Sequence, residues 1–205
     1  MRKTILAVLL TVFLSELSFA QEGLRLGVEV SPAWVLNMHR NKTTTIRTYE
    51  SGYGFNLGVP LKYHFGEYSG VETGLTFEYF AFDNRANNML ISSNRFATLN
   101  LPLTYLYQIT GDWYAHFGGG VKYQIMNRAW SGWSVDISPS VNRVQPYAAL
   151  GASTFLERDN GMFELGVMAR YHFINLWKEN SVQASGSTSK IVSFDMQLRF
   201  YFINP

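Results

Sequence analysis

Residues 99–125 read LNLPLTYLYQITGDWYAHFGGGVKYQI, and this stretch decides the fold. Apolar side chains occupy every second position of its first arm, from Leu99 to Ile109, and the second arm repeats the alternation from Trp113 to Ile125. A period of two indicates a β-strand with one apolar face. The Thr-Gly-Asp sequence at 110–112 between the arms is typical of a tight turn. The stretch is therefore predicted to form a β-hairpin.

The length of the two arms points to a membrane. They are about eleven and thirteen residues long, whereas strands of soluble sheets usually have about five or six residues. A tilted strand needs about nine to eleven residues to cross a bilayer. The face opposite the apolar one has glycines, glutamines, His116 and Lys122, which do not suit a soluble core. We therefore expect a transmembrane β-barrel whose outer face meets lipid and whose interior is polar.

The first 20 residues have the features of a signal peptide. Residues 1–3 form a basic head, an apolar run extends from Ile5 to Leu14, and small residues follow at 18–20. The run is too short to cross a membrane as a helix, which takes about twenty residues. We expect export and cleavage before Gln21, which leaves residues 21–205 as the outer-membrane β-barrel domain.

The composition fits an exported membrane barrel. The 205 residues include no Cys, which excludes disulfides, thiolate metal sites and cysteine nucleophiles. The formal net charge is +2, with 17 basic and 15 acidic residues. Removal of residues 1–20 takes away Arg2, Lys3 and Glu16 and leaves nearly equal numbers of the two kinds. Nucleic-acid binding therefore has no electrostatic footprint in this chain.

The same alternation predicts six further strands, at 23–34, 53–65, 71–79, 144–155, 163–173 and 194–202. Long polar connections are expected at 37–48, 83–95, 127–142 and 175–189, and they alternate with short turns. Outer-membrane barrels have an even number of strands, short periplasmic turns and longer external loops. The predicted fold is therefore an all-β, eight-stranded, antiparallel up-and-down transmembrane β-barrel in the bacterial outer membrane. A soluble lipocalin-like barrel, the competing fold, would place its apolar face inward and its charges outside.

Charged residues on the face opposite the apolar one should point into the barrel. The five cations and five anions are Arg25, Lys62, Lys122, Arg170, Arg199, Glu29, Glu72, Glu78, Glu164 and Asp195. Side chains nearly fill the interior of an eight-stranded barrel, and an unpaired buried charge is costly. We therefore expect a salt-bridged lumen network that holds the barrel together. A narrow path for ions or solutes is the alternative, and the bulk of these side chains argues against it.

Two further expectations concern aromatic residues and prolines. Aromatic residues group near both ends of the predicted strands and predict two interfacial girdles. The external girdle should include Trp34, Tyr49, Tyr53, Tyr79, Phe96, Tyr123 and Tyr171. Proline removes a donor from the strand ladder, and a closed barrel has no free edge to accommodate it. We expect a β-bulge near each of Pro60, Pro102 and Pro146.

Several local features resemble a known family. The signal peptide, Leu-Pro-Leu at 101–103, Gly-Gly-Gly at 118–120 and the overall size resemble the small outer-membrane β-barrel family typified by PorT in Bacteroidota. The resemblance implies an eight-stranded outer-membrane barrel. The namesake is associated with the secretion system that exports gliding and virulence proteins. The resemblance brings no catalytic residues, and a shared fold does not by itself imply a shared role.

Catalysis is the first alternative function. Some eight-stranded barrels are lipid A deacylases or palmitoyltransferases with Ser, His and an acid near the external leaflet. Of the four histidines, only His172 lies at the external end of a predicted strand, and Ile174 rather than a serine follows two residues later. A triad assembled from distant strands stays open. We interpret His172 as a lumen hydrogen-bonding residue and predict no enzyme, no cofactor and, because no ligand spacing supports one, no metal site.

The third external loop contains the remaining candidate site. Trp130, Trp133, Asp136 and Arg143 lie in or beside it. Exposed tryptophans are enriched in binding hot spots, so this loop is a candidate surface for a protein or glycan. The same tryptophans would suit the girdle at the lipopolysaccharide boundary, which is the interpretation we favour.

The sequence thus predicts a non-enzymatic outer-membrane protein. Its role would be structural, adhesive or accessory to envelope transport through the external loops, with a narrow small-solute pore as a second alternative. The expected partners are outer-membrane lipid and lipopolysaccharide, an envelope protein, and the outer-membrane assembly machinery. That machinery would recognise the aromatic end of the last strand, Phe200 to Phe202.

Overall fold

The computed structural model describes residues 23–41, 47–65, 68–86, 89–130, 133–158, 161–178 and 187–202. The predicted signal peptide lies outside these residues. The strands are β1 (Leu24–Asn41), β2 (Arg47–His64), β3 (Ser69–Ala86), β4 (Met89–Thr110), β5 (Trp113–Trp130), β6 (Ser134–Asp136), β7 (Val144–Arg158), β8 (Gly161–His172) and β9 (Ser187–Phe202). A short 3-10 helix, η1 (Ser138–Ser140), precedes β7. Within the described residues, no helix is long and apolar enough to cross a membrane.

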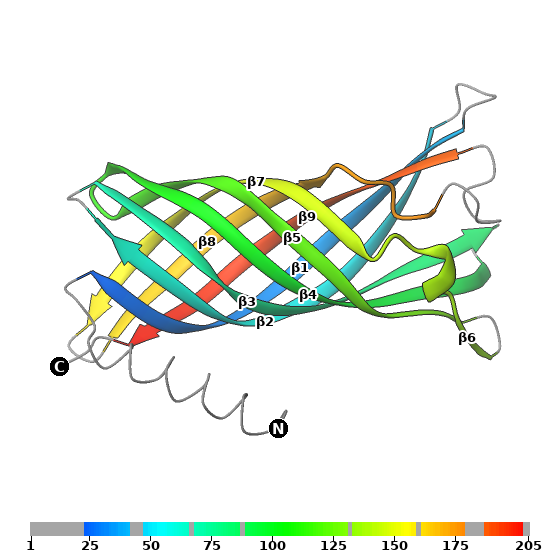
Figure 1. Cartoon of the computed structure of the whole chain (residues 1–205), viewed down its shortest axis with the longest axis horizontal. Coiled ribbons are helices and arrows are strands. Elements are labelled where there is room, and N and C mark those ends of the chain that lie inside the picture. The colour runs from blue at the N-terminus through cyan, green and yellow to red at the C-terminus, as the bar shows by residue number, and fades with distance from the viewer. Residues whose placement is uncertain are drawn as a thin grey trace, which may run out of the picture.

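Eight long strands close into an antiparallel barrel (Figure 1). The order is β4-β3-β2-β1-β9-β8-β7-β5, and the ladder between β4 and β5 closes the ring. The three-residue strand β6 pairs only with the far end of β5. These pairings confirm the predicted eight-stranded up-and-down barrel. We call the end with the short β4–β5 turn periplasmic and the opposite end external, because the short turns of outer-membrane barrels are periplasmic.

The hairpin that decided the fold forms as predicted. β4 ends at Thr110 and β5 begins at Trp113. Gly111 between them has φ +50°, in the left-handed region that glycine adopts without a steric cost. Tyr105 pairs with Phe117 across the hairpin, and both point outward.

The two faces of the barrel have the polarity of a membrane protein. Outward-facing Leu103 and Val167 are 63% and 60% exposed, while inward-facing Lys62 and Asn100 are completely buried. An apolar exterior around a polar interior is the reverse of a soluble barrel. This finding excludes the lipocalin-like alternative.

The strands are longer than the alternation predicted. The loop expected at 83–95 is mostly strand, because β3 continues to Ala86 and β4 already begins at Met89. Asp83 pairs with Ser93 in this extension. Beyond the lipid, an outward residue no longer has to be apolar, so the alternation fades although backbone pairing continues. The predicted loop boundaries were therefore wrong, whereas the strand positions were correct.

The predicted bulges at Pro60, Pro102 and Pro146 are wrong. The register shifts in the described ladders lie elsewhere, at Asn84, Ala97 and Gln108. Beside Pro60, the β1–β2 ladder stops after Leu26 and resumes at Glu29 in the same register. A missing N–H therefore leaves a short gap in hydrogen bonding, and no extra residue is needed.

One member of the predicted external girdle is misplaced. Phe96 points into the barrel and is completely buried, whereas its neighbour Arg95 is exposed on the outer wall. The position of a residue along the barrel axis does not determine which face of the strand it occupies, so its height alone does not place it in the girdle. The side chain of Tyr49 lies outside the described part of the structure. Trp34, Tyr53 and Tyr123 are exposed on the outer wall, as a girdle requires.

Candidate functional site

The inward charges form two layers, and the first lies toward the periplasmic end. Arg199 is its centre: Nε lies 2.8 Å from Glu29 Oε2, and Nη1 lies 2.8 Å from Glu72 Oε2 and 3.4 Å from Glu164 Oε2. Ser31 Oγ donates to the other oxygen of Glu29 at 2.8 Å. Arg199 is on β9, and its three partners are on β1, β3 and β8. One guanidinium group therefore links four strands through the lumen.

Lys62 completes the periplasmic layer. Its Nζ lies 2.9 Å from Glu164 Oε2 and 3.4 Å from Glu72 Oε2. The same ammonium group lies 4.1 Å from the ring centroid of Phe155 and 4.7 Å from that of Tyr201. Two carboxylates and two aromatic faces thus surround this buried cation, which offsets its loss of hydration.

Three residues of this layer, Glu72, His116 and Glu164, bring potential metal ligand atoms within 4.8 Å of one another. Both carboxylates already contact Lys62, whose ammonium group neutralises their charge. Arg199 contacts both of them as well. A divalent ion bound here would have to displace two buried cations. The cluster is therefore better described as an ion-pair network than as a metal site.

Ser153, His116 and Glu164 have the residue types of a hydrolase triad, but not its geometry. Ser153 Oγ lies 2.7 Å from His116 Nε2, and Glu164 Oε1 lies 3.4 Å from the same nitrogen. A triad histidine uses one ring nitrogen for the hydroxyl and the other for the acid. His116 Nδ1 has no hydrogen-bond partner within the described residues. All three side chains are also buried in the lumen, away from any lipid substrate.

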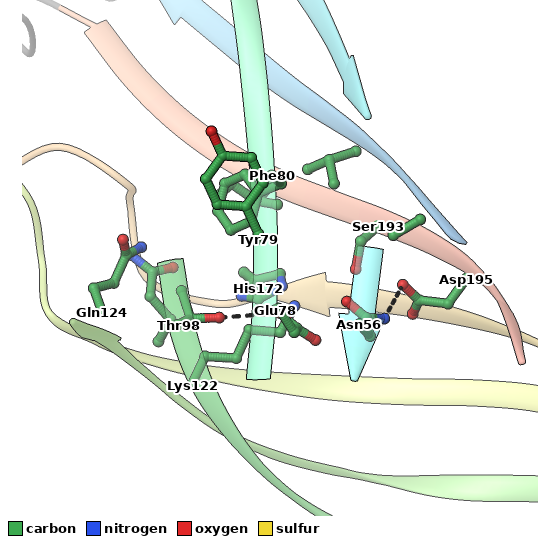
Figure 2. Close-up of a pocket in the computed structure, with 14 residues that line it drawn as sticks. Asn56, Glu78, Tyr79, Phe80, Thr98, Lys122, Gln124, His172, Ser193 and Asp195 are labelled. Atoms are coloured by element: carbon green, nitrogen blue, oxygen red, sulfur yellow. Dashed lines mark hydrogen bonds and ion pairs between the residues drawn. The ribbon is translucent and has the colours of Figure 1, made fainter. Parts of the chain in front are cut away.

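The second charged layer lies toward the external end (Figure 2). Glu78 receives Lys122 Nζ at 2.7 Å and Arg170 Nη1 at 3.2 Å, and Arg170 also pairs with Asp195. Figure 2 shows the hydrogen bonds that Thr98 donates to Glu78 and Asn56 donates to Asp195 in this layer. Two cations thus balance two carboxylates.

Nine of the ten predicted lumen charges lie in these two layers. Arg25 is the exception: it lies at the periplasmic end and its guanidinium contacts the sulfur of Met162. The nine are four cations and five carboxylates, and His116 lies 3.4 Å from Glu164, so the two layers are nearly balanced in charge. Their arrangement is that of a filled interior.

His172 borders a small cavity in the external layer. Its ring lies 5.5 Å from that of Tyr147, and neither of its nitrogens has a hydrogen-bond partner among the described residues. The hydrogen bonds expected for His172 are thus not seen there. The cavity, also lined by Gln124, Gln145 and Ser193, has a volume of about 10 Å³. This volume suits about one water molecule and is far too small for a lipid substrate.

An apolar plug closes the lumen at the external end. Inward-facing Val35, Phe80, Phe82, Phe96 and Ile191 pack against Ile137, Val141, Leu176 and Trp177 from the external connections. Asn142 N donates to Leu176 O at 2.9 Å, and Lys178 N donates to Ser140 O at 2.9 Å. These backbone bonds hold the two connections together. Strand alternation did not predict this plug, although Phe80, Phe82 and Ile191 occupy inward positions of their strands.

The four candidate loop residues lie around the external rim. Trp130 and Trp133 are 48% and 73% exposed at the end of the β5–β6 hairpin. Asp136, on the same hairpin, accepts a hydrogen bond from Ser138 N at 2.9 Å. Hydrogen bonds from Ser138, helped by the charges of Arg128 and Arg143, hold the pKa of Asp136 below its usual value. Arg143 is exposed just before β7. The structure thus places the two tryptophans and Asp136 on one hairpin, with Arg143 at the neighbouring strand.

Comparison with known proteins identifies the family. The family model "Outer membrane protein beta-barrel domain" matches residues 19–202. Ail, the attachment invasion locus protein of Yersinia pestis, solved with the heparin analogue sucrose octasulfate, is 14% identical; the match covers 86% of this chain and 99% of that chain, with a TM-score of 0.44. Neisserial surface protein A is 14% identical, with 88% and 99% covered and a TM-score of 0.47. OprG from Pseudomonas aeruginosa is 13% identical, with 89% and 97% covered and a TM-score of 0.43.

No curated protein matches the chain. The family model extends from the end of the predicted signal peptide to the last residue of β9. With the closed barrel, its apolar exterior and its polar interior, this match assigns the chain to the outer membrane protein β-barrel domain family, and the protein is an outer-membrane protein.

Proposed function

We propose that the protein is a non-enzymatic outer-membrane barrel that acts through its external rim. Its role is adhesive, structural or accessory to envelope transport, as the PorT resemblance suggests. The observation that supports this proposal best is a contrast: the lumen is filled with paired charges and plugged by Trp177, whereas Trp130 and Trp133 are exposed at the rim.

The filled lumen argues against the small-solute pore. Lys62 and Glu164, at the centre of the periplasmic layer, are completely buried. The plug around Phe96 and Trp177 adds an apolar barrier above the charged layers. A solute would have to break ion pairs and displace apolar side chains in turn, both of which are costly.

The geometry also argues against a lipid A-modifying enzyme. His172 is buried beside Tyr147 and borders a cavity of about 10 Å³. His116 and Ser153 are buried near the periplasmic end, away from the leaflet that contains lipid A. Neither histidine is placed to act on an acyl chain at the outer surface.

The β5–β6 hairpin has the composition of a contact surface. Trp130, Trp133 and Val135 are all largely exposed, and the hairpin extends β5 at the external end of the barrel (Figure 1). Exposed tryptophans supply much of the binding energy at protein interfaces. We therefore now prefer a contact surface to the girdle for these two tryptophans, and the partner we propose is another envelope protein.

Photo-crosslinking in cells of the native host tests this proposal. A photo-reactive amino acid at position 135, which is exposed beside the tryptophans, should give a discrete adduct with an envelope protein. The adduct should disappear in a Trp130→Ala, Trp133→Ala background. It should persist with Trp113→Ala, a matched control for an exposed tryptophan at the periplasmic end.

Two results would contradict the proposal. One is an adduct at position 135 that is unchanged by the double substitution. The other is a change in the lipid A acyl chains, measured by mass spectrometry, when the protein is expressed, because this change would make the protein an enzyme.

A further inference from the structure

Two arginines face each other on the outer wall of the barrel near its external end. Arg95 on β4 pairs directly with Arg128 on β5. Both side chains are exposed and point outward. Like charges directly opposite each other across an antiparallel ladder destabilise the strand pair. This arrangement is therefore unfavourable unless nearby anions offset the two charges.

The arginine pair lies where the lipid-facing band ends. Along β4, the outward residues from Tyr105 to Ala97 are uncharged, and Arg95 is the first charge after them. Tyr105 is an exposed aromatic residue toward the periplasmic end, where an aromatic girdle borders the apolar band. Arg95 lies ten residues from it, which corresponds to about 25 Å along the barrel axis at about 3.3 Å per residue and a tilt of about 40°. The apolar band of an outer-membrane barrel is also about 25 Å tall. The two arginines are thus level with the headgroups of the external leaflet.

The register shift after Ala97 brings Arg128 to this position. Outward residues of β5 have odd numbers up to Ile125, whereas Arg128 and Trp130 have even numbers. The extra residue at the shift moves Arg128 to the outer face, opposite Arg95, because a one-residue slip exchanges the two faces of a strand. Without the shift, Arg128 would point into the plug.

The other groups around the pair offset only part of its positive charge. Within the described residues, no carboxylate lies within ion-pair distance of Arg95 or Arg128. Asp136 is opposite Arg128 and interacts with it electrostatically, so this carboxylate offsets part of the Arg128 charge. Asp83 pairs with Ser93, farther from the membrane. The Trp130 ring lies 5.9 Å from the Arg95 guanidinium and holds it against the wall.

We propose that Arg95 and Arg128 bind the phosphate groups of lipid A in the external leaflet. Guanidinium groups form paired hydrogen bonds with phosphate oxygens, and one phosphate between two arginines would remove their repulsion. The height of the pair selects a membrane lipid over a soluble anion, since the headgroup phosphates lie at this level. The site lies on the barrel wall and adjoins, through Trp130, the envelope-protein contact proposed for the hairpin; its test leaves Trp130 unchanged.

Native mass spectrometry of refolded residues 21–205 in phosphatidylethanolamine nanodiscs tests the site. Lipid A with its phosphates and enzymatically dephosphorylated lipid A are added in parallel. Wild type should retain the phosphorylated lipid about 5- to 25-fold better, since each of the two exposed ion pairs contributes up to about a factor of five. Arg95→Gln, Arg128→Gln should lose this preference, and Lys178→Gln, which removes an exposed cation of another external connection, should keep it.

A second variant guards against a folding defect. Arg95→Lys, Arg128→Lys retains both charges but not the paired donors, and should show an intermediate preference. All variants are first checked for the gel shift on boiling that marks a folded barrel.

Several results would overturn the site. These are an unchanged preference in the double Gln variant, an equal loss in Lys178→Gln, and equal retention of the two lipids by wild type. Arginine-dependent binding of inorganic phosphate without a preference for phosphorylated lipid A would show that the ligand is a soluble anion. A crosslinked partner at position 135 is unaffected by any of these results, so the two proposals fail separately.

Discussion

Lys62 Nζ lies 2.9 Å from Glu164 Oε2 in the periplasmic half of the barrel, and both side chains are completely buried. Glu164 also contacts Arg199, so this pair belongs to a network that links β2, β3, β8 and β9. A filled lumen of this kind joins strands that do not pair with each other, such as β2 and β8.

Removal of the Lys62 charge should destabilise the barrel strongly. Lys62→Met leaves two carboxylates without their shared cation, and breaking a buried ion pair costs about 3–5 kcal/mol. Urea unfolding in detergent, followed by the gel shift, measures this loss. The double variant Lys62→Met, Glu164→Gln should recover part of it, because a buried charge is removed with its partner. A Lys62→Met barrel as stable as the exposed control Arg143→Met would contradict the network.

The plug should protect Trp177 from solvent. Trp177 is 5% exposed, whereas Trp133 is 73% exposed. The chain has five tryptophans, and the measurement uses two variants in which either Trp133 or Trp177 is retained and the other four are replaced by Phe. Acrylamide should quench Trp133 fluorescence strongly and Trp177 fluorescence weakly. Equal quenching of the two would show that the external connections do not fill the mouth.

Glycine is required where β3 passes Pro60. Gly74 has φ +153°, and a Cβ there would lie 2.5 Å from Val59 O and 2.9 Å from Pro60 Cα. Gly74→Ala should therefore cost about 2 kcal/mol or more. Gly111→Ala is the matched control, because its φ is also positive but a Cβ there meets nothing within 4 Å; it should cost only about 1–2 kcal/mol, the strain of the left-handed backbone. A smaller cost at Gly74 than at Gly111 would refute this assignment.

The Asp136 carboxylate should remain ionised at unusually low pH. Its pKa is lowered chiefly by hydrogen bonds from Ser138. A group with a lowered folded-state pKa stabilises its loop fully above its ordinary pKa, and this stabilisation disappears as the pH falls through the lowered value. An NMR titration should show the Asp136 pKa rising in Ser138→Ala but not in the control Ser134→Ala. The opposite pattern would assign the shift to another cause.

Strand alternation made much of the fold and of the lumen predictable. The hairpin around Gly111 and the outward face of Leu99, Leu101 and Leu103 follow directly from a period of two. The same period places Lys62, Glu72 and Glu164 inside, where the structure brings them together.

Other features depend on contacts that a local pattern does not contain. The register shift after Ala97 exchanges the faces of β5 and brings Arg128 to the outer wall, so the arginine pair could not be seen from alternation alone. The plug joins residues 137–141 to residues 176–177 through tertiary contacts. The position of Phe96 along the strand predicts a girdle residue, but its side chain faces the lumen and is buried.

Planar-bilayer recording of the refolded wild-type barrel tests the central claim most directly, which is that the barrel is closed inside and acts through its external rim. With Lys62, Arg199 and Glu78 in place and the plug around Trp177 intact, we predict no stable conductance steps, even though the gel shift shows a folded barrel. Reproducible steps from the folded wild-type protein would contradict the account and support the pore.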